Sequence, residues 1–189
     1  MQILFCNYEY PPLGGGGGVV NAALAAELAK RHKVTVLTSR AFGLPPETVT
    51  DGVRILRTPV ILRRDAAAAT FASMAAYVLT GTWTGRRLVR RERFDVINTH
   101  FALPTGPVGW SLAKTSGTPN VLTVHGGDLY DPSKRSSAPR HAPLRYCVRR
   151  IARAADAVVA QSRDTAANLR KYYAPAIEPL VIPLGIPPP

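Results

Sequence analysis

MQILFCNYEYPPLGGGGGVVNAALAAELAKR, residues 1–31, is the stretch that decides the fold of this chain. An apolar run of strand type, 2–7, leads into a loop with two prolines and five consecutive glycines, and residues 19–31 then carry apolar side chains at helical spacing. A helix that starts after a glycine loop leaves backbone N–H groups without partners. Such a helix start favours an anion, so the stretch predicts a phosphate-binding crevice.

The rest of the chain alternates between strand and helix patterns. We expect further strands at 34–38, 53–58, 95–99, 120–125, 157–160 and 180–182, and helices at 65–92, 105–116, 139–154 and 163–172, with a loop at 44–52 and a break of the long helix near Gly81 or Gly85. This alternation predicts an α/β fold, a three-layer, Rossmann-like, doubly wound parallel sheet. Residues 1–182 form one domain in this prediction, and 183–189 begin a linker.

The charge of the chain is strongly positive, with 24 Lys and Arg against 12 Asp and Glu. Arginines cluster at 86–93 and at 145–153. Such clusters attract anionic lipid, nucleic acid or a phosphorylated substrate, or they are simply solvated helix faces. Aromatic residues are 7% of the chain and do not interleave with the arginines in any RNA-reading pattern, so we expect no nucleic-acid partner.

Two features bear on the location of the protein. Residues 66–85 are uncharged over the length that spans a bilayer, but they contain four threonines and a single leucine, which favours a buried or surface-lying helix. Cys6 and Cys147 form neither a disulfide framework nor a metal-binding spacing, and no secretory signal is visible. We therefore expect a cytoplasmic protein, with peripheral contact to an anionic membrane surface as a further expectation.

The glycine run is the first candidate site. Gly14, Gly15, Gly16 and Gly17 are predicted to bind a diphosphate, although a flexible turn of low complexity would have the same sequence. A dinucleotide fingerprint fits less well, because the seven residues 7–13 intervene before the first glycine. Arg40, at the end of the second strand, keeps NADP open as an alternative cofactor.

A second candidate site follows two other strands. His125 ends the strand 120–125, with Gly126 and Asp128 directly after it, and His100 comes at the end of the strand 95–99. Because parallel strands end at one edge of a sheet, these residues are expected beside the glycine run. The alternative is a turn with a structural histidine and a capping aspartate. No histidine or cysteine has zinc spacing, so no metal site is predicted.

Five segments together resemble a known family. PPLGG (11–15), FDVINTH (94–100), TVHGGDL (123–129), ADAVVAQS (155–162) and VIPLGI (181–186) occur in the order and spacing of the amino-terminal half of retaining glycosyltransferases of family 4, which have the GT-B fold. The resemblance extends over the entire chain. It departs from the family pattern at Leu184, where an asparagine is usual, and it lacks the carboxyl half that holds most of the donor site.

The resemblance implies roles for these residues. The glycine amides would approach the diphosphate of a nucleotide-sugar donor, and His125 would be the catalytic residue beside the transferred sugar, with no metal or cofactor in the chemical step. Residues assigned to acceptor or sugar binding are Glu9, Tyr10, His100, Gly126, Asp128 and Tyr130. The implied partners are the donor, shared with an absent second domain, and a glycan, lipid or small-molecule acceptor.

The leading prediction is therefore the acceptor-binding domain of a glycosyltransferase, inactive on its own. The alternatives are an NADP-dependent oxidoreductase domain and a non-catalytic module that binds a phosphorylated glycan or an anionic lipid.

Overall fold

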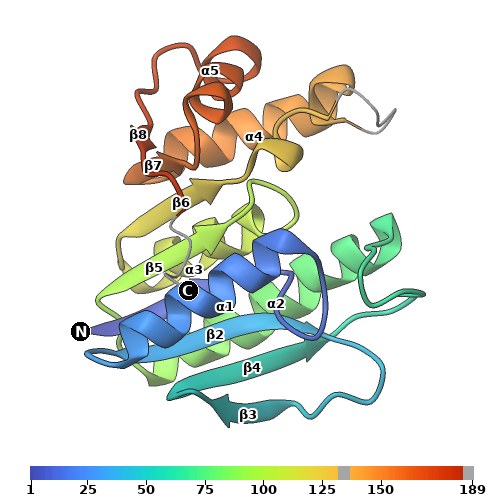
Figure 1. Cartoon of the computed structure of the whole chain (residues 1–189), viewed down its shortest axis with the longest axis vertical. Coiled ribbons are helices and arrows are strands. Elements are labelled where there is room, and N and C mark those ends of the chain that lie inside the picture. Colours follow the sequence, from blue (N-terminus) through green and yellow to red (C-terminus); the bar gives the residue numbers. More distant parts are fainter. Residues whose placement is uncertain (132–136, 185–189) are drawn as a thin grey trace, which may run out of the picture.

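The computed structural model describes residues 1–131 and 137–184. Within them, one eight-stranded sheet has the strand order β3-β4-β2-β1-β5-β6-β7-β8 (Figure 1). The strands are β1 (Gln2–Cys6), β2 (Lys33–Arg40), β3 (Glu47–Thr50), β4 (Val53–Pro59), β5 (Val96–His100), β6 (Asn120–Val124), β7 (Ala157–Ala160) and β8 (Leu180–Val181). The helices are α1 (Gly16–Ala29), α2 (Phe71–Arg91), α3 (Gly106–Ser116), α4 (Ala142–Ala154) and α5 (Arg163–Tyr172), with short 3-10 turns η1 (Gly126–Asp128) and η2 (Ala138–Arg140).

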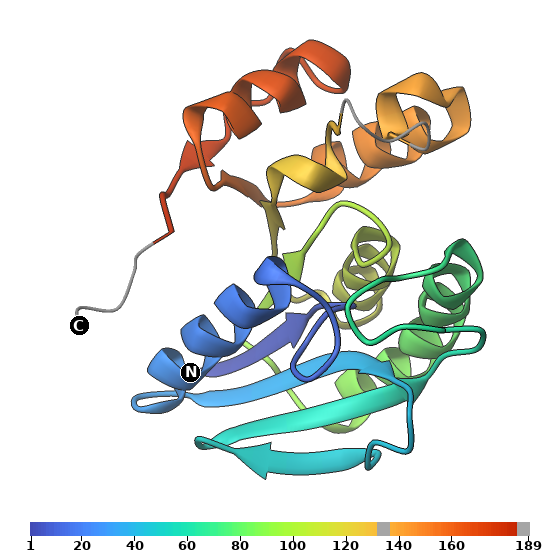
Figure 2. The ribbon, with the colours of Figure 1, turned by 45° about the vertical axis from the view of Figure 1, so that its right-hand side comes forward.

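The helices cover the sheet in layers, as predicted. Helix α1 lies on one side of the sheet, and α2 and α3 lie on the other (Figures 1 and 2). Apolar side chains of β1, β2 and β4 pack against α1, whereas Leu4, Leu37 and Ile97 pack against α2 and α3. A further core cluster joins β6 and β7 to α4 and α5. The three-layer α/β architecture of the prediction is confirmed.

Helix α2 is continuous and starts later than predicted. The Thr70 side chain accepts a hydrogen bond from the Ser73 amide, so the helix begins at Phe71 rather than at residue 65. Gly81 and Gly85 do not break it. A side chain at Gly85 would lie 2.7 Å from Leu112, so this glycine allows α2 to pack closely against α3. Among the described helices, none is long and apolar enough to cross a membrane.

The other elements lie close to their predicted positions. Helix α1 begins at Gly16, three residues before the predicted start, so the second half of the glycine run belongs to its first turn. The basic segment 139–154 divides into η2 and α4. Ser162 caps α5, since its hydroxyl accepts a hydrogen bond from the Thr165 amide. Of the predicted linker, 183–189, the structure describes residues 183 and 184, and residues 185–189 lie outside the described part of the chain.

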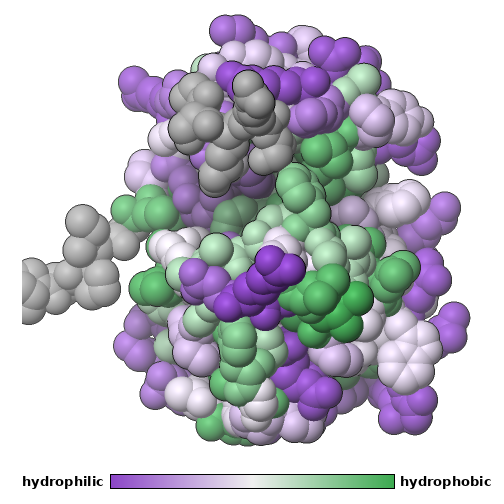
Figure 3. Space-filling model, turned by 90° about the vertical axis from the view of Figure 1, so that its right-hand side faces the viewer, coloured by the Kyte–Doolittle hydropathy of each residue, from purple (hydrophilic) through white to green (hydrophobic). Residues whose placement is uncertain are grey.

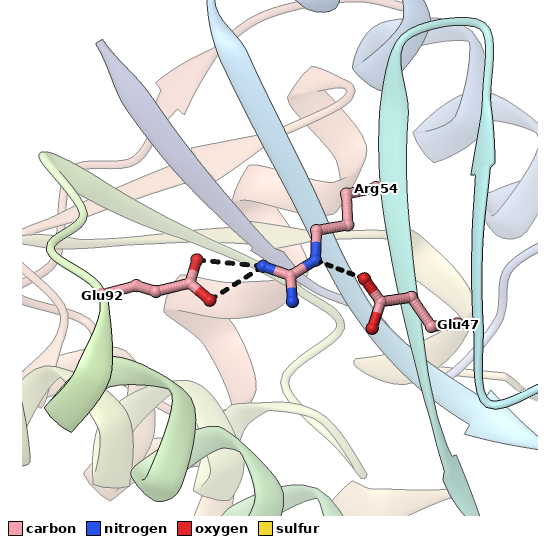
Figure 4. Close-up of polar contacts among 3 residues, drawn as sticks. All are labelled: Glu47, Arg54 and Glu92. Carbon is pink, nitrogen blue, oxygen red and sulfur yellow. Dashed lines mark hydrogen bonds and ion pairs between the residues drawn. The ribbon is translucent and has the colours of Figure 1, made fainter.

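Strand β3 corrects the prediction of a loop at 44–52 and of a wholly parallel sheet. Asp51 and Gly52 both have positive φ, and they join β3 to β4 in an antiparallel hairpin. Arg54 of β4 connects this edge to the end of α2, donating to Glu47 at 2.7 Å and to Glu92 at 2.8 Å (Figure 4). Hydrogen bonds to these two carboxylates raise the pKa of the Arg54 guanidinium.

Candidate functional site

A cavity of about 780 Å³ opens where β1, β5 and β6 end. Its walls come from the first turn of α1, the first turns of α2, and the loops that follow β5 and β6. The carboxyl ends of parallel strands are the usual ligand-binding edge of such sheets. The predicted glycine and histidine loops therefore do meet at one cavity. Both Gly17 and His125 line it.

The amides of the glycine run are not equivalent. Gly14 donates to the carbonyl oxygen of Ala66 at 2.7 Å, and Gly15 donates to a carboxylate oxygen of Glu9 at 3.0 Å. The amides of Gly16 and Gly17 have no hydrogen-bond partner within the described part of the chain, and both residues line the cavity. The amides of the run that are free to receive a ligand are thus those of its second half, at the start of α1.

Steric contacts explain why several of these positions are glycine. Gly14 has a φ of +100°, and a side chain there would collide with Glu9. A side chain at Gly17 would overlap the ring of Phe101, and one at Gly18 would lie 3.2 Å from the backbone of Glu9. By contrast, a side chain at Gly15 or Gly16 would meet no atom within 4 Å. Open space lies in front of Gly16.

Arg63 holds the segment that anchors the glycine run. It is buried and lies over the ring of Tyr8, with its guanidinium carbon 5.1 Å from the ring centre. It donates to the carbonyl oxygens of Asp65, at 3.0 Å, and Ala66, at 2.7 Å. Because the Ala66 oxygen also accepts from Gly14, Arg63 fixes the entry to the glycine run.

His125 lies on the cavity wall with most of its ring buried. Its Nε2 is 3.0 Å from Nδ1 of His100, and its ring stacks on Phe101 at a centre-to-centre distance of 4.3 Å. Burial lowers the pKa of His125 to about 4, although a hydrogen bond with Gln161 acts in the opposite direction. His125 is therefore neutral at physiological pH.

His100 does not reach the cavity, contrary to its predicted role in sugar binding. The side chain is 1% exposed and lies behind His125, against Phe5. Burial, together with the neighbouring His125, lowers its pKa to about 3, and its Nε2 has no hydrogen-bond partner among the described residues. Its contact within the described residues on the cavity side is with the ring of His125.

Phe101 is a cavity residue that the sequence did not reveal. It follows β5 with a φ of +71°, an uncommon conformation for a side chain of this size. Its amide donates to the carbonyl oxygen of Thr123 at 3.0 Å, which ties it to β6. Nonlocal contacts with Gly17 and His125 position the ring, and no local pattern in the sequence signals them.

Asp128 joins the two loops at the cavity. One carboxylate oxygen accepts from the His125 amide at 2.9 Å, and the other accepts from the Ala102 amide at 2.6 Å. Burial raises the pKa of Asp128 to about 7, against the effect of these backbone hydrogen bonds. Asp128 lines the cavity. Its carboxylate, however, accepts hydrogen bonds from backbone amides, as expected for the alternative interpretation in which it caps the turn after β6.

The remaining predicted acceptor residues divide between the cavity and the interior. Glu9 lines the cavity. Tyr10 is buried in the core beneath α1, Gly126 faces Thr165 of α5, and Tyr130 stacks on Tyr172 at 5.1 Å, so none of these three is on the cavity wall. The structure thus places Tyr10, Gly126 and Tyr130 away from this cavity, and their role in acceptor or sugar binding stays a prediction.

An apolar wall of the cavity, formed by α2, was not predicted residue by residue. Phe71, Met74 and Val78, on one face of α2, line the cavity. The sequence did contain one indication of this wall, because the three residues are spaced by three and four positions within the uncharged segment 66–85 and so share one helix face. Arg40, the predicted marker of NADP, is not among the lining residues. In the part of the chain that the structure describes, no group of three or more His, Cys, Asp and Glu residues is placed to hold a metal ion.

Comparisons with known proteins agree with this fold. The family model described as Glycosyltransferase Family 4 matches residues 14–188. Glycogen synthase of Mycobacterium tuberculosis H37Rv is 26% identical over 196 residues, which cover 96% of this chain and 47% of the relative. An uncharacterized glycosyltransferase of Methanocaldococcus jannaschii is 34% identical over 53 residues, which cover 28% of this chain and 15% of the relative.

Solved structures show the same architecture. Sucrose-phosphate synthase from Thermosynechococcus elongatus superposes with a TM-score of 0.74 at 20% identity, covering 96% of this chain and 47% of that one. MurG of Acinetobacter baumannii gives a TM-score of 0.54 at 14% identity over 96% of this chain and 44% of that one. The chain spans at most about half the length of these relatives. The resemblance read from the sequence is thereby confirmed, and the chain belongs to Glycosyltransferase Family 4.

Proposed function

We propose that this chain forms the acceptor-side half of an enzyme that transfers a sugar, with retention, from a nucleotide-sugar donor to an amphipathic acceptor. The observation that carries the proposal is the meeting of three groups at one cavity, the unpaired amides of Gly16 and Gly17 and the imidazole of His125. Membership of the glycosyltransferase family supports it.

The two amides supply electrostatic stabilisation. When the bond between the sugar and the diphosphate breaks, negative charge develops on the leaving oxygen. Fixed N–H donors at a helix start stabilise that charge without reorganising. Glu9 already accepts from the Gly15 amide, so the donors offered to a diphosphate are those of Gly16 and Gly17.

His125 acts as a neutral hydrogen-bonding group in this proposal. A pKa of about 4 makes it a weak base at neutral pH, so it orients the sugar rather than removing a proton. Its Nε2 is paired with His100, and Phe101 covers one face of the ring. These contacts fix the direction of the ring, and in this proposal a sugar hydroxyl takes the place of Gln161 as its hydrogen-bond partner.

The apolar wall indicates the acceptor class. Phe71, Met74 and Val78 stand on the α2 side of the cavity, whereas the polar groups lie on the glycine and histidine loops. An acceptor with a hydroxyl at one end and an apolar part beside it matches both walls. A lipid or another amphipathic molecule therefore fits better than a wholly polar sugar.

The test uses the longest reading frame that carries this chain, incubated with a panel of nucleotide sugars and acceptors and followed by mass spectrometry. His125→Ala is expected to lower kcat by about tenfold or more, since one positioned hydrogen-bonding group contributes at least that much. His32→Ala, at the far edge of the sheet, is the matched control. Unchanged kcat in His125→Ala would contradict the assigned role.

The isolated chain provides a second test. Residues 1–189 alone are expected to bind acceptor but not to release product, because relatives of known length are about twice as long. Sugar transfer by residues 1–189 at the rate of the longer protein would contradict the assignment to an acceptor-side half.

A further inference from the structure

The helices α2, α3 and α4 carry positively charged side chains and no negatively charged ones. They expose nine cations, which we call the basic helical face: Arg86, Arg87, Arg90, Arg91, Lys114, Arg145, Arg149, Arg150 and Arg153. A one-sided surface of this kind attracts an anionic partner over about a Debye length.

Aromatic side chains stand among these cations. Trp83 is 68% exposed and lies 5.9 Å from the guanidinium carbon of Arg87. Trp110 lies 5.6 Å from the ammonium nitrogen of Lys114 and 6.0 Å from the guanidinium carbon of Arg150. Tryptophan beside lysine and arginine is the composition of a membrane–water interface.

Exposed aliphatic and aromatic residues continue from this face toward the cavity. Leu79, four residues before Trp83, and Phe71, at the start of the helix, are largely exposed on α2, and Ile61 and Leu62 are exposed in the preceding loop. Figure 3 shows hydrophobic side chains gathered in the middle of the face where α2 begins, with hydrophilic ones around them. Because Phe71 also lines the cavity, the exposed strip reaches the cavity mouth.

We propose that the basic helical face and the exposed strip formed by Ile61, Leu62, Phe71, Leu79 and Trp83 bind the surface of an anionic membrane. The arginines and Lys114 meet lipid headgroups, and the apolar strip enters the boundary between headgroups and acyl chains. Nucleic acid would match the charge but would leave the apolar strip in water. The proposal goes beyond the proposed function, because membrane binding needs no transfer reaction.

Contact with the membrane at Phe71 would place the cavity mouth at the lipid surface. An acceptor embedded in the membrane would then reach the wall made by Met74 and Val78 without leaving the lipid entirely.

The test is vesicle binding by the purified chain. The two tryptophans of the sequence, Trp83 and Trp110, both lie on this surface, so their fluorescence reports contact directly. We expect sedimentation with vesicles of phosphatidylcholine containing about one-third phosphatidylserine, weaker binding as salt is raised, and quenching of tryptophan by brominated lipid. Vesicles of phosphatidylcholine alone should bind much less.

Variants separate the charge from the apolar strip. Arg86→Gln, Arg87→Gln and Arg90→Gln together should weaken partitioning about 100-fold, since each basic residue near an anionic surface is worth about fivefold. Leu79→Ser with Trp83→Ser should weaken it about tenfold or more. Lys30→Gln with Arg31→Gln, at the end of α1 on the other side of the sheet, should leave it unchanged. Circular dichroism checks that each variant is folded.

Each of four results would overturn the proposal. The first three are equal binding to neutral and anionic vesicles, equal loss in the α1 control pair, and binding to single-stranded RNA without binding to anionic vesicles. The fourth is unchanged binding to anionic vesicles in the variant that carries Leu79→Ser and Trp83→Ser, because a membrane would then not be the partner of this surface.

Discussion

Gly16→Ala and Gly17→Ala form a matched pair that tests how the glycine run is built. Both residues lie in the first turn of α1, where alanine favours the helix over glycine by up to about 1 kcal/mol. A methyl group at Gly16 would meet no atom within 4 Å, so this gain is retained. A methyl group at Gly17 would overlap the ring of Phe101, which must then move off His125.

The two substitutions should change stability in opposite directions. Gly16→Ala should raise the free energy of unfolding by about 0.5–1 kcal/mol, partly because the unfolded chain loses conformational freedom. Overpacking costs about 1–3 kcal/mol, so Gly17→Ala should lower the free energy of unfolding by about 1–2 kcal/mol. Urea unfolding monitored by tryptophan fluorescence measures both values. Equal shifts, or a gain in stability at Gly17, would refute the packing of Phe101 against this glycine.

Three further predictions concern charge and ionisation. Between pH 7 and pH 5 the unfolded state protonates His100 and His125 while the folded state keeps them neutral, which lowers the free energy of unfolding by about 2 kcal/mol for each histidine. Over the same range the folded state takes up a proton at Asp128, because the pKa of this carboxyl is raised, and this increases the free energy of unfolding by about 2 kcal/mol. Asp128→Asn should therefore lose about 4 kcal/mol of stability over this range in urea titrations, and the native chain only about 2 kcal/mol. Arg54→Met should cost about 1 kcal/mol at low salt and less in concentrated NaCl, as measured by thermal unfolding, because its ion pairs with Glu47 and Glu92 are partly exposed. Cys6 should resist a thiol reagent until the chain unfolds, since burial raises its pKa to about 12, so a native chain that labels quickly at both cysteines would contradict its place in β1.

Local patterns in the sequence were enough to predict most of the sheet. Continuous apolar runs such as 34–38 and 157–160 identified buried parallel strands, because both faces of such strands are covered. Asp51-Gly52 was read as a loop marker, although the same pair is a strong hairpin signal when β-branched residues flank it. The sequence did not reveal the ion pairs of Arg54, which hold the edge strand β3. One of these pairs depends on the position of Glu92, which is distant in the sequence.

The candidate site was predictable only at the level of loops. His125 and the glycine run could be brought together because parallel strands end at one edge. The inward orientation of His100 and Tyr10, the hydrogen bond from Gly15 to Glu9 and the positive φ of Phe101 all depend on contacts between distant parts of the chain. Periodicity and local motifs contain no information about such contacts.

The packing around Phe101 couples the two halves of the site. The absence of a side chain at Gly17 makes room for the Phe101 ring, the ring stacks on His125, and His125 is hydrogen-bonded to His100. The spacing between the free amides and the imidazole is therefore set by a rigid aromatic ring and not by the glycine loop alone. If the proposed transfer reaction is correct, a substitution at Gly17 disturbs both the amides and the orientation of His125, whereas one at Gly16 obstructs only the space in front of the amides. Donor affinity should fall in both variants, but kcat should fall further at Gly17, because only there does the change reach the imidazole.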